Sequence, residues 1–157
     1  MNIYLRPLRE EDALVSYRWR NNPAIWKLTG NKPNAIVTPE IETNWIREVL
    51  NKTDQRRFAI CVEGSDEYIG NAQLTGIDRG TAEFHIFIGE EKYWGQGIGT
   101  KATKFVVEIG FKLLGLREIY LFVNKKNVAA VKAYLNCGFL IDGCSESRIK
   151  MVVHNGE

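Results

Sequence analysis

The chain has 157 residues, of which 45% are hydrophobic and 25% charged, and its formal net charge is +2. This size and composition are typical of one globular domain, so we expect residues 1–157 to fold as a unit. So small a net charge does not indicate a nucleic acid or a membrane surface as partner, and no apolar run approaches the ~20 residues of a spanning helix.

The chain contains three cysteines, and neither their number nor their spacing suggests a disulfide framework or a metal site. They are Cys61, Cys137 and Cys144. The polar N-terminus has no signal-peptide pattern. Together these features predict reduced thiols in a cytoplasmic protein without a metal.

The first 50 residues predict one strand and two helices. Residues 1–8 are typical of a strand, and residues 10–22 of a helix that stops before a proline. Residues 23–37 are expected to form a loop or a broken helix. The second helix begins with Thr38 as N-cap and Pro39 at its first position. Its expected apolar face consists of Ile41, Trp45, Ile46, Val49 and Leu50.

The apolar period then changes from helical to alternating. Three strands are predicted at residues 58–63, 68–77 and 81–89, separated by short glycine-containing turns. Turns this short join antiparallel strands, so we expect a meander.

The second half predicts helices that alternate with strands. After a glycine-rich turn, a helix is expected from about residue 97 to 114, with an apolar face formed by Ala102, Phe105, Val106, Ile109, Leu113 and Leu114. A strand at 118–123, a helix at 127–136 and strands at 138–144 and 148–154 follow. This order implies some parallel pairing. The expected fold class is therefore α+β (mixed α/β), with a twisted mixed sheet of about seven strands, antiparallel in its first half, flanked by about four helices.

Glycines recur at Gly95, Gly97 and Gly99, directly before the long helix. A glycine-rich turn that opens a helix directs several backbone N–H groups at one point, which predicts an anion site. A P-loop is excluded because Lys101 follows Thr100 rather than the last glycine. The spacing Gly-x-Gly-x-Gly also differs from the dinucleotide fingerprint Gly-x-Gly-x-x-Gly.

Two segments resemble the GNAT acetyltransferase superfamily. Residues 94–99 resemble its coenzyme A loop, Gln/Arg-x-x-Gly-x-Gly/Ala, with Trp94 at the first position, as is usual in the RimJ/RimL-like branch. Residues 127–139 resemble the element Asn-x-x-Ala-x-x-x-Tyr-x-x-x-Gly-Phe. Its matching positions are Asn127, Ala130, Tyr134, Gly138 and Phe139. The first 80 residues match only in the order of elements.

The resemblance implies a GNAT-type sheet and transfer of an acetyl group from acetyl-coenzyme A to an amine. It places the pyrophosphate on backbone N–H groups of residues 96–100 and the pantetheine arm along residues 87–89, where a backbone N–H would stabilise the oxyanion. The implied coenzyme-binding residues are Phe87, Ile88, Gly89, Trp94, Gly95, Gln96, Gly97, Ile98, Gly99, Thr100 and Asn127.

Three side chains are candidates for the proton transfers. Tyr134 matches the family's proton donor to the departing thiolate, and its reference pKa of about 10, above ~8.5 for a thiol, makes it a hydrogen-bond donor first. Glu83 and His85 alternate with apolar residues along their strand, so they share the face from which the amine's proton would be taken, through water. Alternatively, Tyr134 and His85 are structural and Glu83 pairs with a cation.

The acceptor is indicated only by residues 18–37, which contain four cations and no acidic residue. A polyamine pocket should be acid-rich, so this segment favours a partly anionic acceptor such as a nucleotide-linked amino sugar. The candidate acceptor-binding residues are Arg20, Asn21, Trp26 and His85. A solvated surface or a site for the coenzyme's 3′-phosphate would explain the same cations. A non-catalytic coenzyme A sensor, and acetylation of a polyamine or a protein N-terminus, are the alternative functions. A homodimer is compatible with the sequence.

Overall fold

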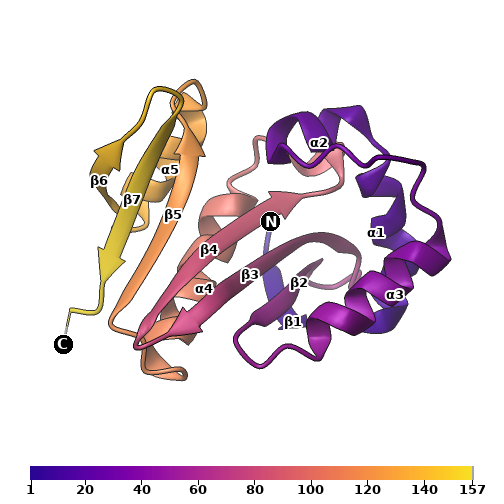
Figure 1. The fold of residues 1–157 in the computed structure, drawn as a ribbon, viewed down its shortest axis with the longest axis horizontal. Coiled ribbons are helices and arrows are strands. Elements are labelled where there is room, and N and C mark those ends of the chain that lie inside the picture. Colours follow the sequence, from indigo (N-terminus) through magenta and orange to yellow (C-terminus); the bar gives the residue numbers. More distant parts are fainter. Residues whose placement is uncertain (157) are drawn as a thin grey trace.

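A seven-stranded sheet in the order β1-β2-β3-β4-β5-β7-β6 runs through the computed structural model, which describes residues 1–156 (Figure 1). The strands are β1 (Ile3–Pro7), β2 (Arg56–Val62), β3 (Tyr68–Asp78), β4 (Thr81–Ile88), β5 (Glu118–Asn124), β6 (Leu140–Cys144) and β7 (Arg148–His154). Strands β1 to β4 pair antiparallel, which confirms the predicted meander. The expected mixed α+β fold is confirmed as well.

The sheet opens between β4 and β5. These two strands are parallel, and they pair only where Thr81–Glu83 lie beside residues 118–120. Both strands continue beyond this point, β4 to Ile88 and β5 to Asn124, while their ribbons diverge (Figure 1). A wedge therefore lies between the carboxyl ends of two neighbouring strands, which is where open α/β sheets commonly bind ligands.

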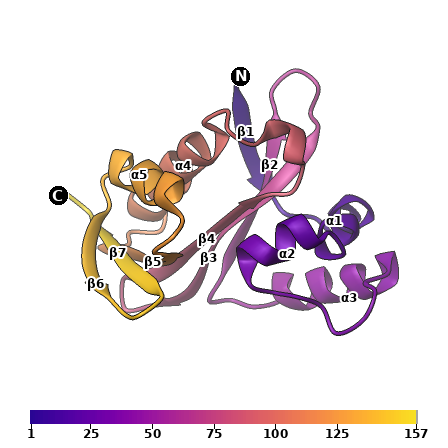
Figure 2. The ribbon, with the colours of Figure 1, turned by 90° about the horizontal axis from the view of Figure 1, so that it is seen from above.

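Helices cover both faces of the sheet (Figure 2). On one face lie α4 (Ile98–Lys112) and α5 (Val128–Asn136), and on the other α1 (Ala13–Arg20), α2 (Pro23–Thr29) and α3 (Pro39–Leu50). Short 3-10 turns precede α1 at Glu10–Asp12 and α4 at Glu91–Tyr93. Within residues 1–156, no helix is both long and apolar enough to cross a membrane.

The region expected to be a loop or a broken helix contains a regular helix, α2. The Asn22 side chain accepts a hydrogen bond from the backbone N–H of Ala24, Pro23 occupies the first turn, and Gly30 ends the helix in the left-handed conformation. These are ordinary start and stop signals of a helix. A loop was the wrong expectation for residues 23–29, because a helix of only seven residues gives a weak periodic pattern. Residues 30–37 contain no helix or strand, as expected.

The expected apolar faces of α3 and α4 were only partly right. In α3, Ile46 is buried, but Ile41 is 51% exposed and the charged Glu42 is buried in its place. Phe105 in α4 is 41% exposed, and Leu113, directly after the helix, is 78% exposed. Two contacts lie on the buried faces that the apolar pattern did not predict. In α3, Glu42 forms an ion pair with Arg20. In α4, Gly110 packs so close to Ile119 that a Cβ would lie 2.8 Å from it.

Candidate active site

Two pockets meet at β4. The glycine-turn pocket, about 410 Å³, lies in the wedge and is lined by the turn before α4, the ends of β4 and β5, and α5. The basic pocket, about 850 Å³, lies on the other face between the sheet and α1–α3, and Arg20, Lys32 and Arg57 are its cations. Four residues line both pockets: Ile25, Thr29, Ile86 and Phe87. The two pockets are therefore adjoining compartments of one site.

The glycine turn presents free backbone donors. Gly95 and Gly97 have φ values of +74° and +75°, a left-handed conformation that side chains with a Cβ rarely adopt. Gly97 is the N-cap of α4 and supplies no side-chain cap, and the first helical bond runs from the N–H of Lys101 to the Gly97 carbonyl. Among the described residues, the N–H groups of residues 98–100 have no backbone or side-chain acceptor. The helix start is thus suited to bind an anion.

Gly99 is a glycine for which the fold gives no structural reason. It lies in α4 with ordinary helical geometry, and a Cβ built on it would meet no atom within 4 Å. The residue nevertheless costs helix stability relative to alanine. Because Gly99 lines the glycine-turn pocket, a ligand that approaches the backbone closely explains it. The pyrophosphate of coenzyme A fits this turn for two reasons: the free N–H groups can donate to its oxygens, and the missing Cβ at Gly99 lets it approach the backbone.

Within residues 87–89, the edge of β4 that faces the wedge offers one further backbone donor. Gly89 donates its N–H to the Ile69 carbonyl at 2.7 Å, so this N–H is not available to a ligand. Hydrogen-bonded and non-hydrogen-bonded pairs alternate along an antiparallel ladder, so the N–H of Ile88 points away from β3, towards the wedge. The Ile88 carbonyl accepts the indole N–H of Trp94 at 2.9 Å. Of the backbone N–H groups of residues 87–89, that of Ile88 is therefore the candidate oxyanion donor.

Gly89 has a packing role instead. A Cβ on this residue would lie 2.0 Å from the ring of Trp19, a buried residue of α1. Eight of the residues expected to bind the coenzyme line the glycine-turn pocket: Phe87, Ile88, Trp94, Gly95, Gly97, Ile98, Gly99 and Asn127. Gly89, Gln96 and Thr100 do not line it. The Gln96 side chain donates to the Lys92 carbonyl at 2.8 Å and so braces the turn.

Tyr134 projects from α5 into the glycine-turn pocket. Its ring stands edge-on to Phe84 and Phe139, with centroids 6.3 and 5.9 Å away, and no hydrogen bond of its hydroxyl is found within residues 1–156. Burial raises the pKa of Tyr134 to about 12. The side chain is therefore a fixed hydroxyl that stays protonated. At the start of α5, Asn127 uses its side-chain oxygen to cap Ala130 at 3.1 Å, which leaves its amide N–H₂ for a ligand.

The floor of the basic pocket is a polar row across three strands. Arg57 on β2 pairs with Gln73 on β3, and Gln73 pairs with His85 on β4. Directly paired residues point to the same face of a sheet, so the three side chains form one row. Trp26 on α2 and Trp45 on α3 contribute to the walls. None of the described residues that line this pocket is acidic.

His85 is the titratable group of the basic pocket, and it lies next to Ile86, which lines both pockets. Its Nε2 lies 3.3 Å from a carboxylate oxygen of Glu83 and 3.2 Å from the Thr75 hydroxyl. Burial lowers the pKa of His85 below its ordinary value; the Glu83 carboxylate opposes this and the Arg57 guanidinium adds to it. Glu83 lines neither pocket. A neutral imidazole thus faces the site, with a carboxylate beside it.

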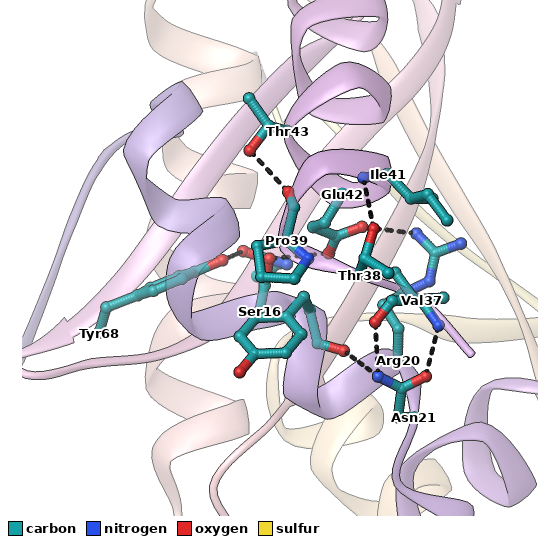
Figure 3. Close-up of polar contacts among 12 residues, drawn as sticks. Ser16, Arg20, Asn21, Val37, Thr38, Pro39, Ile41, Glu42, Thr43 and Tyr68 are labelled. Carbon is teal, nitrogen blue, oxygen red and sulfur yellow. Dashed lines mark hydrogen bonds and ion pairs between the residues drawn. The ribbon is translucent and has the colours of Figure 1, made fainter.

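The residues expected to bind an acceptor separate into two groups. Arg20, Trp26 and His85 line the basic pocket. Asn21 does not, because its amide holds the backbone of Val37: it accepts from the Val37 N–H at 2.7 Å and donates to the Val37 carbonyl at 2.8 Å (Figure 3). The structure therefore gives Asn21 the role of fixing the segment before α3.

Among the lining residues of the basic pocket that sequence reasoning missed are Trp45, Arg57 and Gln73. They come from α3, β2 and β3, far from any motif. Only the strand register brings Arg57 and Gln73 into line with His85, and register depends on long-range pairing.

Comparisons with known proteins agree with this arrangement. The model of the acetyltransferase (GNAT) domain family matches residues 2–140. Spermidine N(1)-acetyltransferase of Escherichia coli is 31% identical over 144 residues, which is 90% of this chain and 75% of that protein.

Two solved structures are also similar. Spermidine N-acetyltransferase from Vibrio cholerae in complex with CoA and spermine superimposes with a TM-score of 0.86 at 23% identity, over 97% of this chain and 95% of that one. An aminoglycoside acetyltransferase in complex with coenzyme A gives a TM-score of 0.82 at 22% identity, over 98% and 95% of the two chains.

Proposed function

The chain belongs to the GNAT acetyltransferase family, and from this premise we propose that it acetylates the primary amine of a small molecule held in the basic pocket. It is an acetyltransferase whose donor is acetyl-coenzyme A. One observation supports the proposal above all: the glycine-turn pocket, with Tyr134, and the basic pocket, with His85, meet at Ile86 and Phe87. A donor and an acceptor can therefore approach each other from opposite faces of β4.

The glycine-turn pocket binds and polarises the donor. Backbone N–H groups of residues 98–100 hold the pyrophosphate, and the Asn127 amide contacts the pantetheine arm. Bound acetyl-coenzyme A supplies the thioester that is attacked. The N–H of Ile88 donates to the carbonyl oxygen as negative charge develops there. Tyr134, whose pKa is about 12, donates a hydrogen bond to the departing sulfur.

The basic pocket prepares the amine. Neutralising an amine of pKa ~10.4 at pH 7 costs about 4.6 kcal/mol, so a nearby base lowers the barrier. His85 accepts this proton, directly or through one water, because its lowered pKa leaves it neutral. Glu83, 3.3 Å away, stabilises the imidazolium that forms. Glu83 therefore acts through His85 rather than on the amine itself.

For the acceptor we propose an amine that also carries negative charge, such as a nucleotide-linked amino sugar. The absence of acidic side chains among the described lining residues supports this choice. Arg20 is paired with the buried Glu42, but Lys32 and Arg57 have no carboxylate partner among the described residues and would repel a polyamine. A polyamine is the second candidate, because the E. coli relative is a spermidine N(1)-acetyltransferase. We also propose a place in the RimJ/RimL-like branch. Trp94 supports it, since its indole joins the glycine turn to β4.

A thiol-release assay over a panel of amines tests the function. The panel contains spermidine, a nucleotide-linked amino sugar and a peptide N-terminus, and coenzyme A binding is measured in parallel by calorimetry. Release of coenzyme A with any amine, reduced in Tyr134→Phe, supports the enzyme. Tight coenzyme binding without turnover of any amine would contradict it and favour a coenzyme A sensor.

We further propose that the chain is a single domain that works in the cytoplasm. The three cysteines support this compartment, because all are free, and Cys61 is fully buried without a disulfide partner. Homodimer formation is a proposal that sedimentation of the purified protein tests directly.

A further inference from the structure

Arg57 is a partly buried arginine whose positive charge is not balanced by an acidic side chain of the described residues. The side chain is half-buried in the floor of the basic pocket, and burial lowers its pKa. Its Nε donates to the Gln55 side chain at 3.0 Å, and the guanidinium lies 5.1 Å from the centre of the Trp45 ring. No aspartate or glutamate within residues 1–156 forms an ion pair with it.

Arg6, on the neighbouring strand, shows how the same fold treats another partly buried arginine. Its two terminal nitrogens contact the two carboxylate oxygens of Asp12 at 2.9 and 2.8 Å, and the pKa of Arg6 is raised rather than lowered. A buried charge without a counter-charge is costly, and a cation–π contact offsets only part of that cost. Arg57 has no such counter-charge among the described residues, so an anionic ligand would stabilise it by supplying one.

A second arginine faces the same tryptophan. The guanidinium of Arg20 lies 4.9 Å from the Trp45 ring centre, so two guanidiniums contact one indole in one pocket. Arg20 donates to buried Glu42 through Nη1 at 3.1 Å (Figure 3), but its buried Nε has no partner among the described residues. The two guanidiniums thus face the same indole and keep N–H groups that a ligand can use.

Both arginines line the pocket that is proposed to hold the acceptor. Neither Arg20 nor Arg57 lines the glycine-turn pocket, so the phosphates of coenzyme A at that turn do not explain them. Arg57 and His85 occupy the two ends of the row through Gln73, and two strand spacings place them roughly 10 Å apart. An acceptor whose amine lies at His85 can therefore place a second group at Arg57 if that group is about one sugar ring away from the amine.

We propose that Arg57, assisted by Arg20, binds an anionic group of the acceptor, so that the substrate carries a primary amine and a carboxylate or phosphate on one small molecule. This inference rests on the proposed function, since it assumes that the basic pocket holds the acceptor. It defines the substrate class by recognition chemistry: guanidinium forks bind planar carboxylates and phosphates through paired hydrogen bonds.

The first experiment needs no turnover. The protein is saturated with coenzyme A, which occupies the glycine turn, and is then titrated with inorganic phosphate or with acetate while the Nε–H signals of its arginines are followed by NMR. We expect saturable binding that is weakened about tenfold in Arg57→Gln and kept in Arg56→Gln, an exposed neighbour on the same strand. Arg57→Lys keeps the charge but not the fork and should bind with intermediate strength. The stronger of the two anions identifies the acceptor's group.

The second experiment compares matched amines in the thiol-release assay: glucosamine with glucosamine 6-phosphate, and butylamine with 4-aminobutanoate. Higher kcat/KM for the anionic member of a pair, lost in Arg57→Gln and kept in Arg56→Gln, supports the inference. It is overturned if neither anion binds, or if Arg57→Gln binds anions as the wild type does. Anion binding by a protein that acetylates none of the tested amines contradicts the proposed function and leaves the anion site standing.

Discussion

The glycine-turn pocket and the basic pocket share the middle of β4 but are built from different parts of the chain. The first uses mainly backbone: free N–H groups at the start of α4, the edge of β4, and glycines that allow close approach. The second uses side chains from α1, α2, α3 and three strands. Backbone recognition suits a donor that every member of such a family shares, whereas side chains can be exchanged to suit different acceptors. Substitutions that act on only one pocket test this division.

The largest effect is expected in the glycine-turn pocket. Tyr134→Phe removes the hydroxyl that donates to the leaving sulfur but keeps the ring contacts with Phe84 and Phe139. We expect kcat to fall about 10²-fold or more, with coenzyme A affinity nearly unchanged. Because the pKa of Tyr134 is about 12, its deprotonation should not limit the wild-type rate at pH 7–10. Equal turnover of the two proteins would remove Tyr134 from the mechanism.

The next effect concerns the contact that joins the two regions. Gly89→Ala places a Cβ against the Trp19 ring, on backbone that has little freedom to move. We expect a loss of about 1–3 kcal/mol in the free energy of unfolding, measured with denaturant. Gly143→Ala is the control, because a Cβ at Gly143 meets no atom within 4 Å. Gly115→Ala is unsuitable because Gly115 has a positive φ, which alanine rarely adopts. A Gly89→Ala protein as stable as the wild type would contradict this packing role.

A smaller effect separates ligand approach from packing within the glycine turn. Gly99→Ala should leave the fold intact or slightly stabilise α4, because alanine is the better helix former and its Cβ meets no protein atom. It should weaken coenzyme A binding about tenfold, as measured by calorimetry, while binding of anions in the basic pocket stays unchanged. Unchanged coenzyme affinity would mean that the ligand does not approach Gly99.

The smallest effect is electrostatic and concerns His85 in the basic pocket. An NMR titration of the two histidines should give His85 a pKa below its ordinary value of about 6.5. Arg57→Gln should raise this pKa, because it removes a nearby positive charge, and Glu83→Gln should lower it further, because it removes the negative one. Since the neutral imidazole is the base, the acid limb of kcat/KM should move to higher pH in Arg57→Gln. A His154→Gln variant assigns the signals, and Arg56→Gln serves as the charge control.

The difference between the pockets also explains what the sequence could predict. The glycine turn, Asn127 and Tyr134 lie within short stretches whose spacing survives without any structure, and most of them line one pocket. The basic pocket depends on register. Arg57 joins His85 only through two strand pairings, and no local pattern reports these. Asn21 is the opposite case, since it lies in the expected segment but its side chain holds the backbone of Val37.

The wedge between β4 and β5 has a consequence for handling the protein. It is an unpaired sheet edge at the centre of the fold, and such edges are templates on which other extended chains can assemble. A ligand that fills the wedge occupies that template and, by mass action, stabilises the folded state by about 2.7 kcal/mol at about 100 times its Kd. Purification and storage with coenzyme A should therefore raise the melting temperature and slow aggregation, and the coenzyme-free protein is the form most prone to self-association.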